Sequence, residues 1–302
     1  MSVVQDHRIR YFFEAVRLGS VRAAADNLDI AASAVSRQIA QLEQELGTTL
    51  VERHRRGVKP TEAGDRVLAY YRQRLAHQDL LMDDLQSLRG LHSGLVSLAV
   101  GEGFIDELAG PLTRFSEQYP QVELVVNVCG SNELIRQVVE DEAHLGLVFN
   151  PASDPKLRSH AHHSQPVRVV VNTDHPLALQ GGPVALKGLD QYRLALPNVS
   201  YGIRQILTQA EQQLGLDLAP TLTCNTIALL KQYALLGGVT LLPTFAVAEE
   251  LKAGELVALA VDSPLFSATQ THLITRLGRQ LSVGASQLMG RLLQEMTAFR
   301  DQ

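Results

Sequence analysis

Polar and basic side chains that can contact a nucleic acid gather between positions 32 and 59. Ser33, Ser36 and Arg37 share one side of a helical repeat with Ala32, and a second group surrounds the next turn: Arg53, Arg55, Arg56 and Lys59. An arginine can donate two hydrogen bonds to the acceptor edge of a guanine, whereas hydroxyls and cations bind phosphate oxygens. The same spacing also fits an ordinary helical hairpin with a solvated polar side, so spacing alone leaves both interpretations open.

Three histidines within four positions raise the question of a metal site. His160, His162 and His163 form a short histidine-rich tract of the kind that can bind metals. However, no nearby cysteine or carboxylate completes a ligand set with a recognised spacing. We therefore interpret this segment as a solvated loop, and we expect neither a metal nor a cofactor.

The two cysteines of the chain, Cys129 and Cys224, each end a predicted strand. An oxidant-sensing pair is conceivable, but reactive thiols need basic neighbours, and none adjoins either residue in the sequence. In a chain that begins without an export signal, these cysteines indicate buried thiols in a reducing compartment. We therefore expect a cytoplasmic protein.

Motifs of common enzyme classes do not occur in the sequence. It contains no Gly-Lys-Thr/Ser phosphate loop, no Gly-x-Ser-x-Gly nucleophile elbow and no His-Glu-x-x-His pair. Gly101-Glu102-Gly103 lacks the third glycine of a dinucleotide-binding fingerprint. The sequence predicts a protein that is not an enzyme.

Three short amphipathic helices are predicted to position the residues around Arg37. Asp6 is a suitable N-cap for the first helix and Ser20 for the second. The third follows a turn at positions 29–31, ends at Gly47, and is expected to bury Val35, Ile39, Leu42 and Leu46. Residues 50–53 and 58–59 flank a basic tip and indicate a small hairpin. Two helices joined by a tight turn, followed by such a wing, are typical of a winged helix-turn-helix.

A long helix is predicted to begin at Thr61 and to end near Gly90. Along it, a seam of alternating three- and four-residue steps runs through Leu68, Tyr71, Leu75, Gln78, Met82, Leu85 and Arg89. This spacing is typical of a coiled coil, in which a second copy of the chain covers the stripe. The alternative is a helix that packs on its own domain.

From Leu95 onward, predicted strands alternate with helices, which favours βα units and mainly parallel sheets. Two of the predicted helices cover residues 105–118 and 132–142, and the last covers residues 282–299. The predicted strands are 95–100, 122–128, 145–149, 167–171, 193–196, 221–224, 239–242 and 271–275.

Length and charge agree with a DNA-binding head on a larger body. The 302 residues suggest about two domains, and no apolar run approaches the roughly 18 residues that span a bilayer. The net charge is −5, but residues 1–75 carry +3 and the remainder carries −8. A modestly basic N-terminal part attached to an acidic part is compatible with a nucleic-acid partner.

The first 65 residues carry many short motifs at positions that together form one pattern. They comprise Tyr11–Ser20, Ala24-Ala25, Leu28, Ala34–Ile39, Leu42-Glu43, Glu45–Gly47, Leu50, Arg53 and Thr61–Gly64. This set resembles the signature of LysR-type transcription regulators. The C-terminal part resembles the family's effector domain more loosely, through Tyr119-Pro120, His175–Ala178 and Gly237–Pro243.

The resemblance implies an α/β fold class with a winged helix-turn-helix, a dimerising linker helix and a two-lobed α/β effector domain similar to periplasmic binding proteins. The implied division is residues 1–60, 61–90 and 91–302, with lobe I at 91–165 and 267–302 and lobe II at 166–266. It also implies double-stranded promoter DNA as a partner, a small-molecule effector of unknown identity, and a homo-oligomer that is a dimer of dimers, with no membrane association.

One departure from the family pattern lies at the start of the third helix. Many relatives have Ser or Thr, then Gln, then Pro or Ser where this chain has Ala31, Ala32 and Ser33. Alanine is a poor N-cap, by about 0.5–2 kcal/mol. Because Ala32 offers only a methyl contact, we expect base specificity to depend on Ser33, Ser36, Arg37 and the wing.

In open α/β lobes, ligands bind outside the carboxyl ends of strands, where helix N-termini attract anions. This rule predicts an effector cleft around Glu102, Gly103, Phe104, Ser131, Asn132, Asn150, Ser200, Tyr201, Arg204, Thr226 and Phe245. Ser131, Ser200 and Thr226 are candidate hydroxyl donors, and Arg204 is a candidate carboxylate partner. Each residue also has an alternative interpretation as a cap or a core residue. Glu102 would disfavour an anion at its helix end, which favours an amphoteric or uncharged effector.

A rival hypothesis is a solute-binding protein or a lyase-like enzyme that is built on the two-lobed domain and uses the N-terminal helices as an oligomerisation arm. The missing export signal argues against a secreted binding protein. The basic wing argues against a bare arm.

Overall fold

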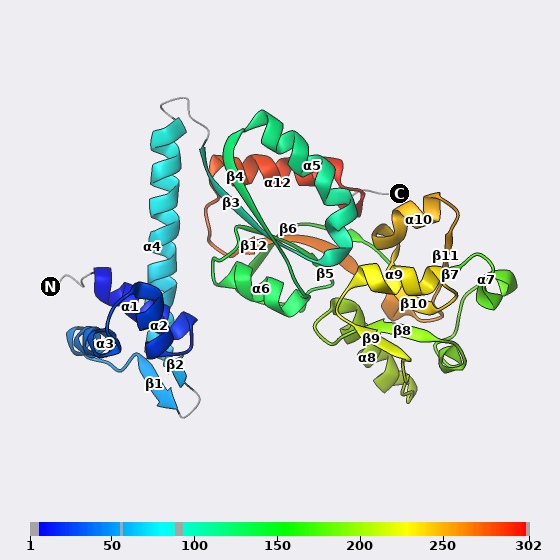
Figure 1. The fold of residues 1–302 in the computed structure, drawn as a ribbon, viewed down its shortest axis with the longest axis horizontal. Coiled ribbons are helices and arrows are strands. Elements are labelled where there is room, and N and C mark those ends of the chain that lie inside the picture. Colours follow the sequence, from blue (N-terminus) through cyan, green and yellow to red (C-terminus); the bar gives the residue numbers. More distant parts are fainter. Residues whose placement is uncertain (1–5, 55–56, 88–92, 300–302) are drawn as a thin grey trace. The chain divides into compact units, whose positions relative to one another are not determined.

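The computed structural model describes residues 6–54, 57–87 and 93–299. The chain divides into an N-terminal unit, residues 1–82, and a C-terminal unit, residues 83–302 (Figure 1). Arg55, Arg56 and Arg89, which belong to the predicted wing and seam, lie outside the described residues.

Three helices form the core of the N-terminal unit: α1 (Asp6–Arg17), α2 (Val21–Leu28) and α3 (Ala32–Leu46). Ser20 caps α2 by accepting a hydrogen bond from the Ala23 amide, and Gly47 ends α3 at a φ of 65°. Phe12, Val35 and Ile39 are completely buried between the helices. The predicted burial of Leu46 is wrong, because this last residue of α3 remains 38% exposed.

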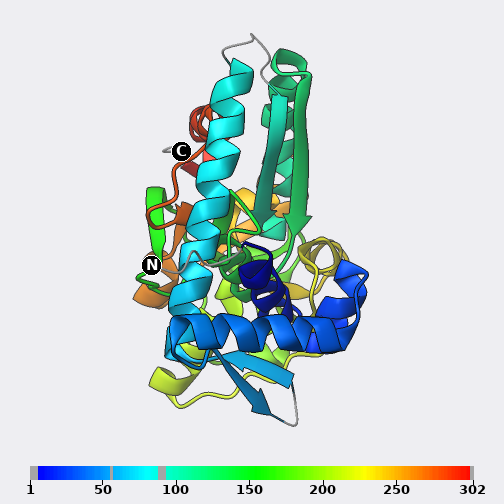
Figure 2. The ribbon, with the colours of Figure 1, turned by 90° about the vertical axis from the view of Figure 1, so that its left-hand side faces the viewer.

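A two-stranded hairpin and a long helix complete this unit. The hairpin consists of β1 (Val51–His54) and β2 (Gly57–Pro60), and it is followed by α4 (Glu62–Ser87). Figure 2 shows α3 running across the N-terminal end of α4, with the hairpin beside it. At about 1.5 Å per residue, the 26 residues of α4 extend over roughly 39 Å.

The seam of α4 consists of two different halves. Leu68 and Tyr71 are buried in the core of their own unit, and Leu75 packs partly against that core. Met82 and Leu85 are 52% and 47% exposed. The alternative of a helix that packs on its own domain therefore holds for the first half of the seam, and among its described residues Met82 and Leu85 form an exposed apolar surface toward the C-terminal end of the helix.

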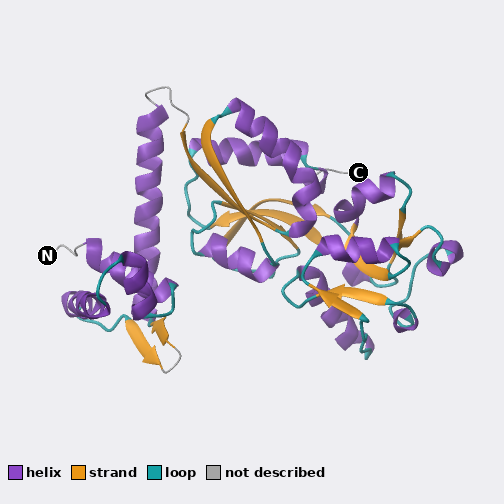
Figure 3. Ribbon diagram, viewed as in Figure 1, coloured by secondary structure: helices purple, strands orange, loops and turns teal. Residues whose placement is uncertain are grey.

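The C-terminal unit contains two five-stranded sheets, each flanked by helices (Figure 3). The first sheet has the order β4-β3-β5-β12-β6, and we call it lobe I together with its helices. Its strands are β3 (Ser93–Val100), β4 (Gln121–Val128), β5 (Leu145–Phe149), β6 (Leu157–Ser164) and β12 (Gln270–Arg276). Its helices are α5 (Ile105–Gln118), α6 (Ser131–Val139) and α12 (Val283–Glu295), with short turns η1 (Glu102–Phe104) and η4 (Thr297–Phe299). Apolar residues that alternate along the strands pack α6 on one face and α5 with α12 on the other.

The second sheet, which defines lobe II, has the order β11-β7-β10-β8-β9. Its strands are β7 (Val167–Asn172), β8 (Leu194–Pro197), β9 (Leu222–Cys224), β10 (Val239–Pro243) and β11 (Leu256–Ala260). Its helices are α7 (Pro176–Gln180), α8 (Gly202–Leu214), α9 (Ile227–Leu235), α10 (Ala248–Lys252) and α11 (Pro264–Ser267), with short turns η2 (Leu189–Gln191) and η3 (Thr244–Val247). Strands β7 and β10 are almost completely buried and form the centre of this lobe.

The chain passes between the two sheets twice, after β6 and again before β12, and the two crossings are hydrogen-bonded to each other. The Gln165 amide donates to the Thr269 carbonyl oxygen at 2.9 Å, and the Thr269 hydroxyl donates to the Gln165 carbonyl oxygen at 2.6 Å. Both residues are buried. The lobes are therefore joined by a pair of neighbouring segments rather than by one.

Three sequence predictions for this unit need correction. The sheets are mixed rather than mainly parallel, because β12 runs antiparallel to its neighbours in lobe I and β7 to its neighbours in lobe II. Strands β6 and β11 were not predicted. The last helix ends at Glu295 because Met296 adopts an extended backbone, with ψ of 130°, before η4.

The histidine tract is part of edge strand β6, so its interpretation as a solvated loop is wrong. His160 is hydrogen-bonded to the Thr275 hydroxyl at 2.9 Å, and His162 stacks on His272, its direct partner on β12. Alternation with Ser and Ala hid the strand, because none of these residues is strongly apolar. Within the described ranges, no three His, Cys, Asp or Glu side chains are grouped so that they could hold a metal ion.

Candidate nucleic-acid interface and ligand cleft

The outward side of α3 presents the short polar side chains that the sequence analysis selected. Ala32, Ser33 and Arg37 are exposed and Ser36 is half-buried. The Arg37 Nε atom donates to the Ser33 carbonyl oxygen at 3.3 Å, which directs the guanidinium along the helix surface. Ala31 is the N-cap of α3 and makes no side-chain capping bond, as predicted.

Buried contacts fix α3 from its inner side. Val35, Ile39 and Leu42 are fully buried against α1 and α2. Arg8 of α1 donates to the Gln38 side chain at 3.1 Å and also contacts Glu45. Because the inner side is held by both apolar and polar contacts, the outer side has a defined orientation.

The position of the wing depends on two contacts that the sequence analysis did not find. One oxygen of Glu43 accepts from the Leu50 amide at 2.7 Å and from the Val51 amide at 3.2 Å. At the tip, Gly57 has a φ of +125°, and a Cβ there would lie 2.2 Å from the Gly19 carbonyl oxygen. Only glycine fits this close approach to the turn between α1 and α2.

Of the cations proposed for the wing, Lys59 is exposed on β2. Arg53 belongs to β1, but its side chain and all of Arg56 fall outside the described residues. The structure therefore brings Lys59 onto the same unit as the α3 surface, and the contributions of Arg53 and Arg56 stay predictions.

In the C-terminal unit, a small cavity lies between lobe I and lobe II. Its volume is about 30 Å³. Six of the predicted effector residues line it: Glu102, Gly103, Phe104, Ser131, Tyr201 and Phe245. The lining also includes Gly101, Gly202 and Ile203, which belong to the same predicted loops, and four residues that were not selected as effector residues: Cys129, Phe149, Ile227 and Pro243. In this arrangement of the lobes the cavity is much smaller than the roughly 300–1,000 Å³ of a typical small-molecule pocket.

Five predicted effector residues do not line this cavity. Asn132 accepts a hydrogen bond from Gln205 at 3.3 Å, and the Ser200 hydroxyl donates to Asn198 at 2.5 Å. Asn150 follows β5 with a positive φ of 45°, and its amide donates to a backbone carbonyl. The other two are Arg204 and Thr226.

Arg204 and Thr226 each have a partner within the protein. Arg204 forms an ion pair with Glu211 at 2.7 Å on the same helix, α8. The Thr226 hydroxyl donates to Glu102 at 2.5 Å. The positive charge that was proposed to bind an effector carboxylate is therefore compensated by Glu211.

Glu102 makes the densest set of contacts in the cleft. It lies in η1 of lobe I, and its carboxylate accepts from the Ile227 amide at 2.7 Å and the Ala228 amide at 3.1 Å, both at the start of α9 in lobe II. Burial raises the pKa of Tyr201, and the adjacent Glu102 carboxylate raises it further. The Tyr201 hydroxyl therefore stays protonated, and it lies 3.2 Å from Glu102 and 2.7 Å from the Asn225 carbonyl oxygen.

Two further contacts join the lobes. Lys231 of α9 forms ion pairs with Asp106 of lobe I at 2.8 Å and with Glu250 of lobe II at 2.6 Å. Burial acts to lower the pKa of Lys231, but hydrogen bonds to the two carboxylates outweigh it, so the net shift is upward. The Gly202 amide at the start of α8 donates to the Ser131 hydroxyl at 3.2 Å. The lobes are thus joined by polar contacts from both α8 and α9 of lobe II.

Cys129 lines the cavity as a protonated thiol. Burial raises its pKa to about 11, and the negative charge of Glu133 adds to the shift. A thiol with such a pKa is a poor nucleophile at neutral pH. The Cys224 thiol donates to the Thr226 carbonyl oxygen at 3.2 Å.

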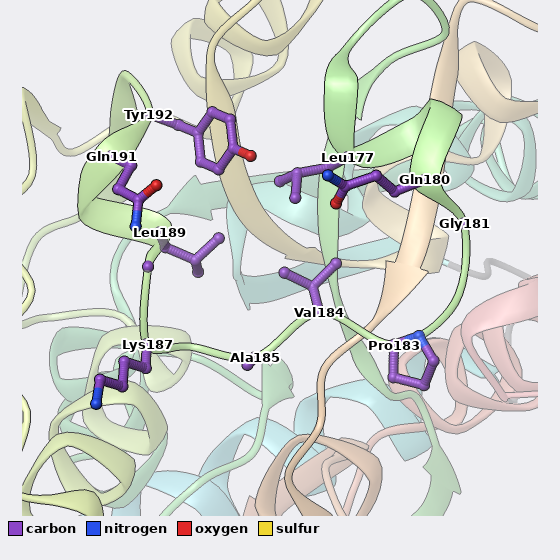
Figure 4. A pocket seen from close by; sticks show the side chains of 11 residues that line it. Leu177, Gln180, Gly181, Pro183, Val184, Ala185, Lys187, Leu189, Gln191 and Tyr192 are labelled. Carbon is purple, nitrogen blue, oxygen red and sulfur yellow. The ribbon is translucent and has the colours of Figure 1, made fainter.

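A second hollow lies on lobe II and shares no lining residue with the cleft (Figure 4). It offers about 250 Å³ between α7 and η2. Leu177, Val184, Leu189 and Tyr192 point toward its interior, and the Lys187 side chain extends at the rim. Its residues belong to separate short turns, so no local sequence pattern predicts it.

The helix-turn-helix, the wing and the two-lobed unit together define a class of protein, the DNA-binding regulators with a ligand-binding domain. Residues 7–65 match the family model described as "Bacterial regulatory helix-turn-helix protein, lysR family", and residues 89–297 match the model described as "LysR substrate binding domain". The chain belongs to the LysR family of transcription regulators. Within the described residues, no helix combines the length and the apolar character needed to cross a membrane.

A curated relative agrees with this membership, and solved structures share the fold. The chain is 26% identical over 289 residues to the RuBisCO operon transcriptional regulator of Allochromatium vinosum, which covers 95% of each chain. A full-length OxyR variant from Pseudomonas aeruginosa has a TM-score of 0.66 at 17% identity, covering 98% of this chain and 95% of that one. The CcmR regulatory domain of Synechocystis in complex with 2-PG has a TM-score of 0.58 at 21% identity and covers 68% of this chain and 98% of that domain.

Proposed function

We propose that this regulator reads its operator through the outward side of α3, with Ala32, Ser33, Ser36 and Arg37 in the major groove. The observation that carries the proposal is the division of α3 into a fully buried side and an exposed polar side. A helix held in this way can enter a major groove, which is wide enough to admit it. Arg37 is the residue suited to a bidentate contact with guanine.

The wing residues Arg53, Arg56 and Lys59 are proposed to bind the flanking phosphates. Such contacts add affinity without base preference and make binding depend on salt. We assign residues 1–60 to DNA binding, 61–90 to the linker and 91–302 to the effector domain.

Two copies of the chain are proposed to pair through the exposed end of the α4 seam, and two such dimers to associate through their effector domains. Leu81, Met82 and Leu85 are about half exposed on this helix, and apolar side chains in such a row favour burial against a partner. A dimer would also hold two DNA-reading units on two half-sites.

The cleft between the lobes is proposed to bind a small-molecule effector. Its support is the cavity itself, which is lined by residues from both lobes. A ligand acts on such a pair of lobes only if it binds one arrangement better than the other. Because the present cavity is much smaller than a typical small-molecule pocket, an effector would bind an arrangement with the lobes further apart. We expect the protein to act in the cytoplasm, without a catalytic step and without a cofactor.

The DNA-reading proposal is tested by a gel-shift assay with the chain's own upstream intergenic DNA at two salt concentrations. Arg37→Ala should weaken operator binding by about 1–3 kcal/mol and relax the base preference, because a bidentate base contact is lost. Lys59→Ala should weaken binding to all sequences alike and reduce the salt dependence. Arg66→Ala is the matched control, since Arg66 is an exposed cation on α4 that pairs with Glu62.

If Arg37→Ala binds the operator as tightly as the parent does and keeps its base preference, the proposed docking side is wrong. An Arg66→Ala variant that loses as much affinity as Arg37→Ala would point instead to a general loss of positive charge.

A further inference from the structure

The Glu102 side chain occupies a position that a free anion would be expected to take. The first turn of a helix has amide groups without intrahelical partners, and these groups together with the helix dipole attract negative charge. In α9, a helix of nine residues, the amides of Ile227 and Ala228 both donate to Glu102. The Thr226 hydroxyl, at the N-cap of α9, donates to the same carboxylate at 2.5 Å.

These three donors belong to lobe II, and the carboxylate belongs to lobe I. Glu102 lies two positions after the end of β3, whereas Thr226 lies 124 positions further along the chain. The contact is therefore a bridge between the lobes, and we call the set of Glu102, Thr226, Ile227 and Ala228 the Glu102 bridge. Opening the cleft would break all three hydrogen bonds at once.

Two spaces adjoin the bridge, and Glu102 lines both of them. One is the cavity of about 30 Å³ between the lobes. The other is a hollow of about 100 Å³, which Ile227, Ala228, Asp106 and Lys231 also line. Because Glu102 already accepts from the amides of Ile227 and Ala228, an acid that entered from either space and bound the same amides would have to displace it.

We propose that Glu102 is a built-in carboxylate ligand, which takes the place of an acidic effector at the start of α9, holds the lobes together and excludes carboxylate-bearing effectors from that position. A tethered group competes with a free ligand at a high effective concentration. The cleft therefore discriminates against small acids as ligands. The inference rests on the proposed function of the cleft, but it concerns the contacts of one side chain and is testable without DNA.

The first experiment removes the carboxylate and restores it from solution. Glu102→Ala in the full-length chain should lower the melting temperature by several degrees, because the α9 donors lose their acceptor. Acetate at about 100 mM should recover part of this loss by ligand linkage, relative to sodium chloride of equal ionic strength. Acetamide, which has the same shape without the charge, should not recover it. The parent should respond to acetate no more than to chloride.

A double variant shows whether acetate binds at the bridge. Thr226→Val in the Glu102→Ala background removes the hydroxyl donor and should abolish most of the acetate response. Glu123→Ala, which removes an exposed carboxylate from β4 of the same lobe, is the matched control and should respond like the parent.

The second experiment measures whether the cleft opens. Cys129 and Cys224 are the two cysteines of the chain, and Cys129 lines the cavity, so a Cys224→Ser background reports on Cys129 alone. A thiol reagent such as dithiobis-nitrobenzoate should react several times faster with the Glu102→Ala variant than with the parent. Acetate should slow this reaction toward the parent rate, and acetamide should not.

Two results would overturn the inference. One is a Glu102→Ala variant that melts and reacts like the parent, and the other is an acetate response no larger than that of acetamide or chloride. If Glu102→Ala does not fold, Glu102→Gln replaces it, because the amide fills the space but turns an NH2 group toward the α9 donors. That variant should melt lower than the parent and show no acetate response, and parent-like melting would refute the bridge. Operator binding and its dependence on Arg37 are measured separately, so a failed bridge leaves the proposed DNA reading standing.

Discussion

Gly202 is the position where adding a single methyl group should separate the lobes. It is the first residue of α8 in lobe II, and a Cβ built on it would lie 2.5 Å from the Phe149 carbonyl oxygen of lobe I. Ordinary contacts of a Cβ begin near 3.4 Å, so about 0.9 Å of additional separation is needed. The obstacle is backbone oxygen at the end of β5, which cannot rotate away as a side chain would.

The sign of the effect follows from two opposing magnitudes. Alanine at a helical position is more favourable than glycine by about 0.5–1 kcal/mol. Overpacking against a rigid neighbour costs about 1–3 kcal/mol. Gly202→Ala should therefore lower the free energy of unfolding by up to about 2.5 kcal/mol, or open the cleft at a similar cost. For a unit of this size the first outcome corresponds to a fall of up to roughly 10 °C in melting temperature.

Thermal melting and hydrogen exchange distinguish these outcomes. In the parent, Glu102 protects the amides of Ile227 and Ala228, so peptides that cover the start of α9 should exchange faster in Gly202→Ala if the lobes separate. Gly290→Ala on α12 is the control, since nothing lies within 4 Å of its Cβ position, and it should gain about 0.5–1 kcal/mol. A Gly202→Ala variant that melts higher than the parent and exchanges at the parent rate would refute the close approach of the lobes.

Three other expectations concern separate parts of the chain. Ala31→Ser should supply the missing cap of α3 and raise the free energy of unfolding, measured in urea, by about 1 kcal/mol. Ser20→Ala removes the cap of α2 and should lower the free energy of unfolding by a similar amount. Met82→Glu should weaken self-association, measured by light scattering, because the Met82 side chain is half exposed on the seam. Gln73→Glu, at an exposed position of the same helix, is the control and should not weaken it. Equal effects of the two substitutions would exclude this seam as the interface. Burial lowers the pKa of His144 to about 4, with Arg279 adding to the shift. The unfolded chain therefore binds a proton at pH values where the folded chain does not, and stability should fall by about 3 kcal/mol between pH 6.5 and 4. This loss should be absent in His144→Asn.

Strong periodicity made most of the fold predictable. The helix at Ile105–Gln118 and the strand at Leu145–Phe149 were predicted with the bounds that the structure has. Their apolar residues repeat at clear helical or strand spacing, which local sequence determines. Strand β6 escaped prediction because its polar residues are held by pairing with β12, about 110 positions away. That pairing is a property of the tertiary structure and leaves no local signal.

The cleft also divides into features that local sequence predicts and features that depend on tertiary contacts. Loops after strand ends correctly indicated Glu102, Ser131 and Tyr201 as neighbours of one cavity. Glu102 was expected to disfavour an anion at its own helix end, but its carboxylate binds the start of α9 across the cleft. Arg204 was expected to face an effector, yet Glu211, two turns along the same helix, compensates its charge. Which donor meets which acceptor depends on distances across the fold that residue types alone do not encode.

The paired crossing at Gln165 and Thr269 has a mechanical consequence. Two neighbouring segments that are hydrogen-bonded to each other can bend together, but they resist twisting and sliding because one segment would have to move relative to the other. We expect lobe II to move over lobe I along a single bending coordinate, as in hinge closure. A ligand or a substitution in the cleft would then change one angle between the lobes. Every part of lobe II would move relative to lobe I in proportion to that angle.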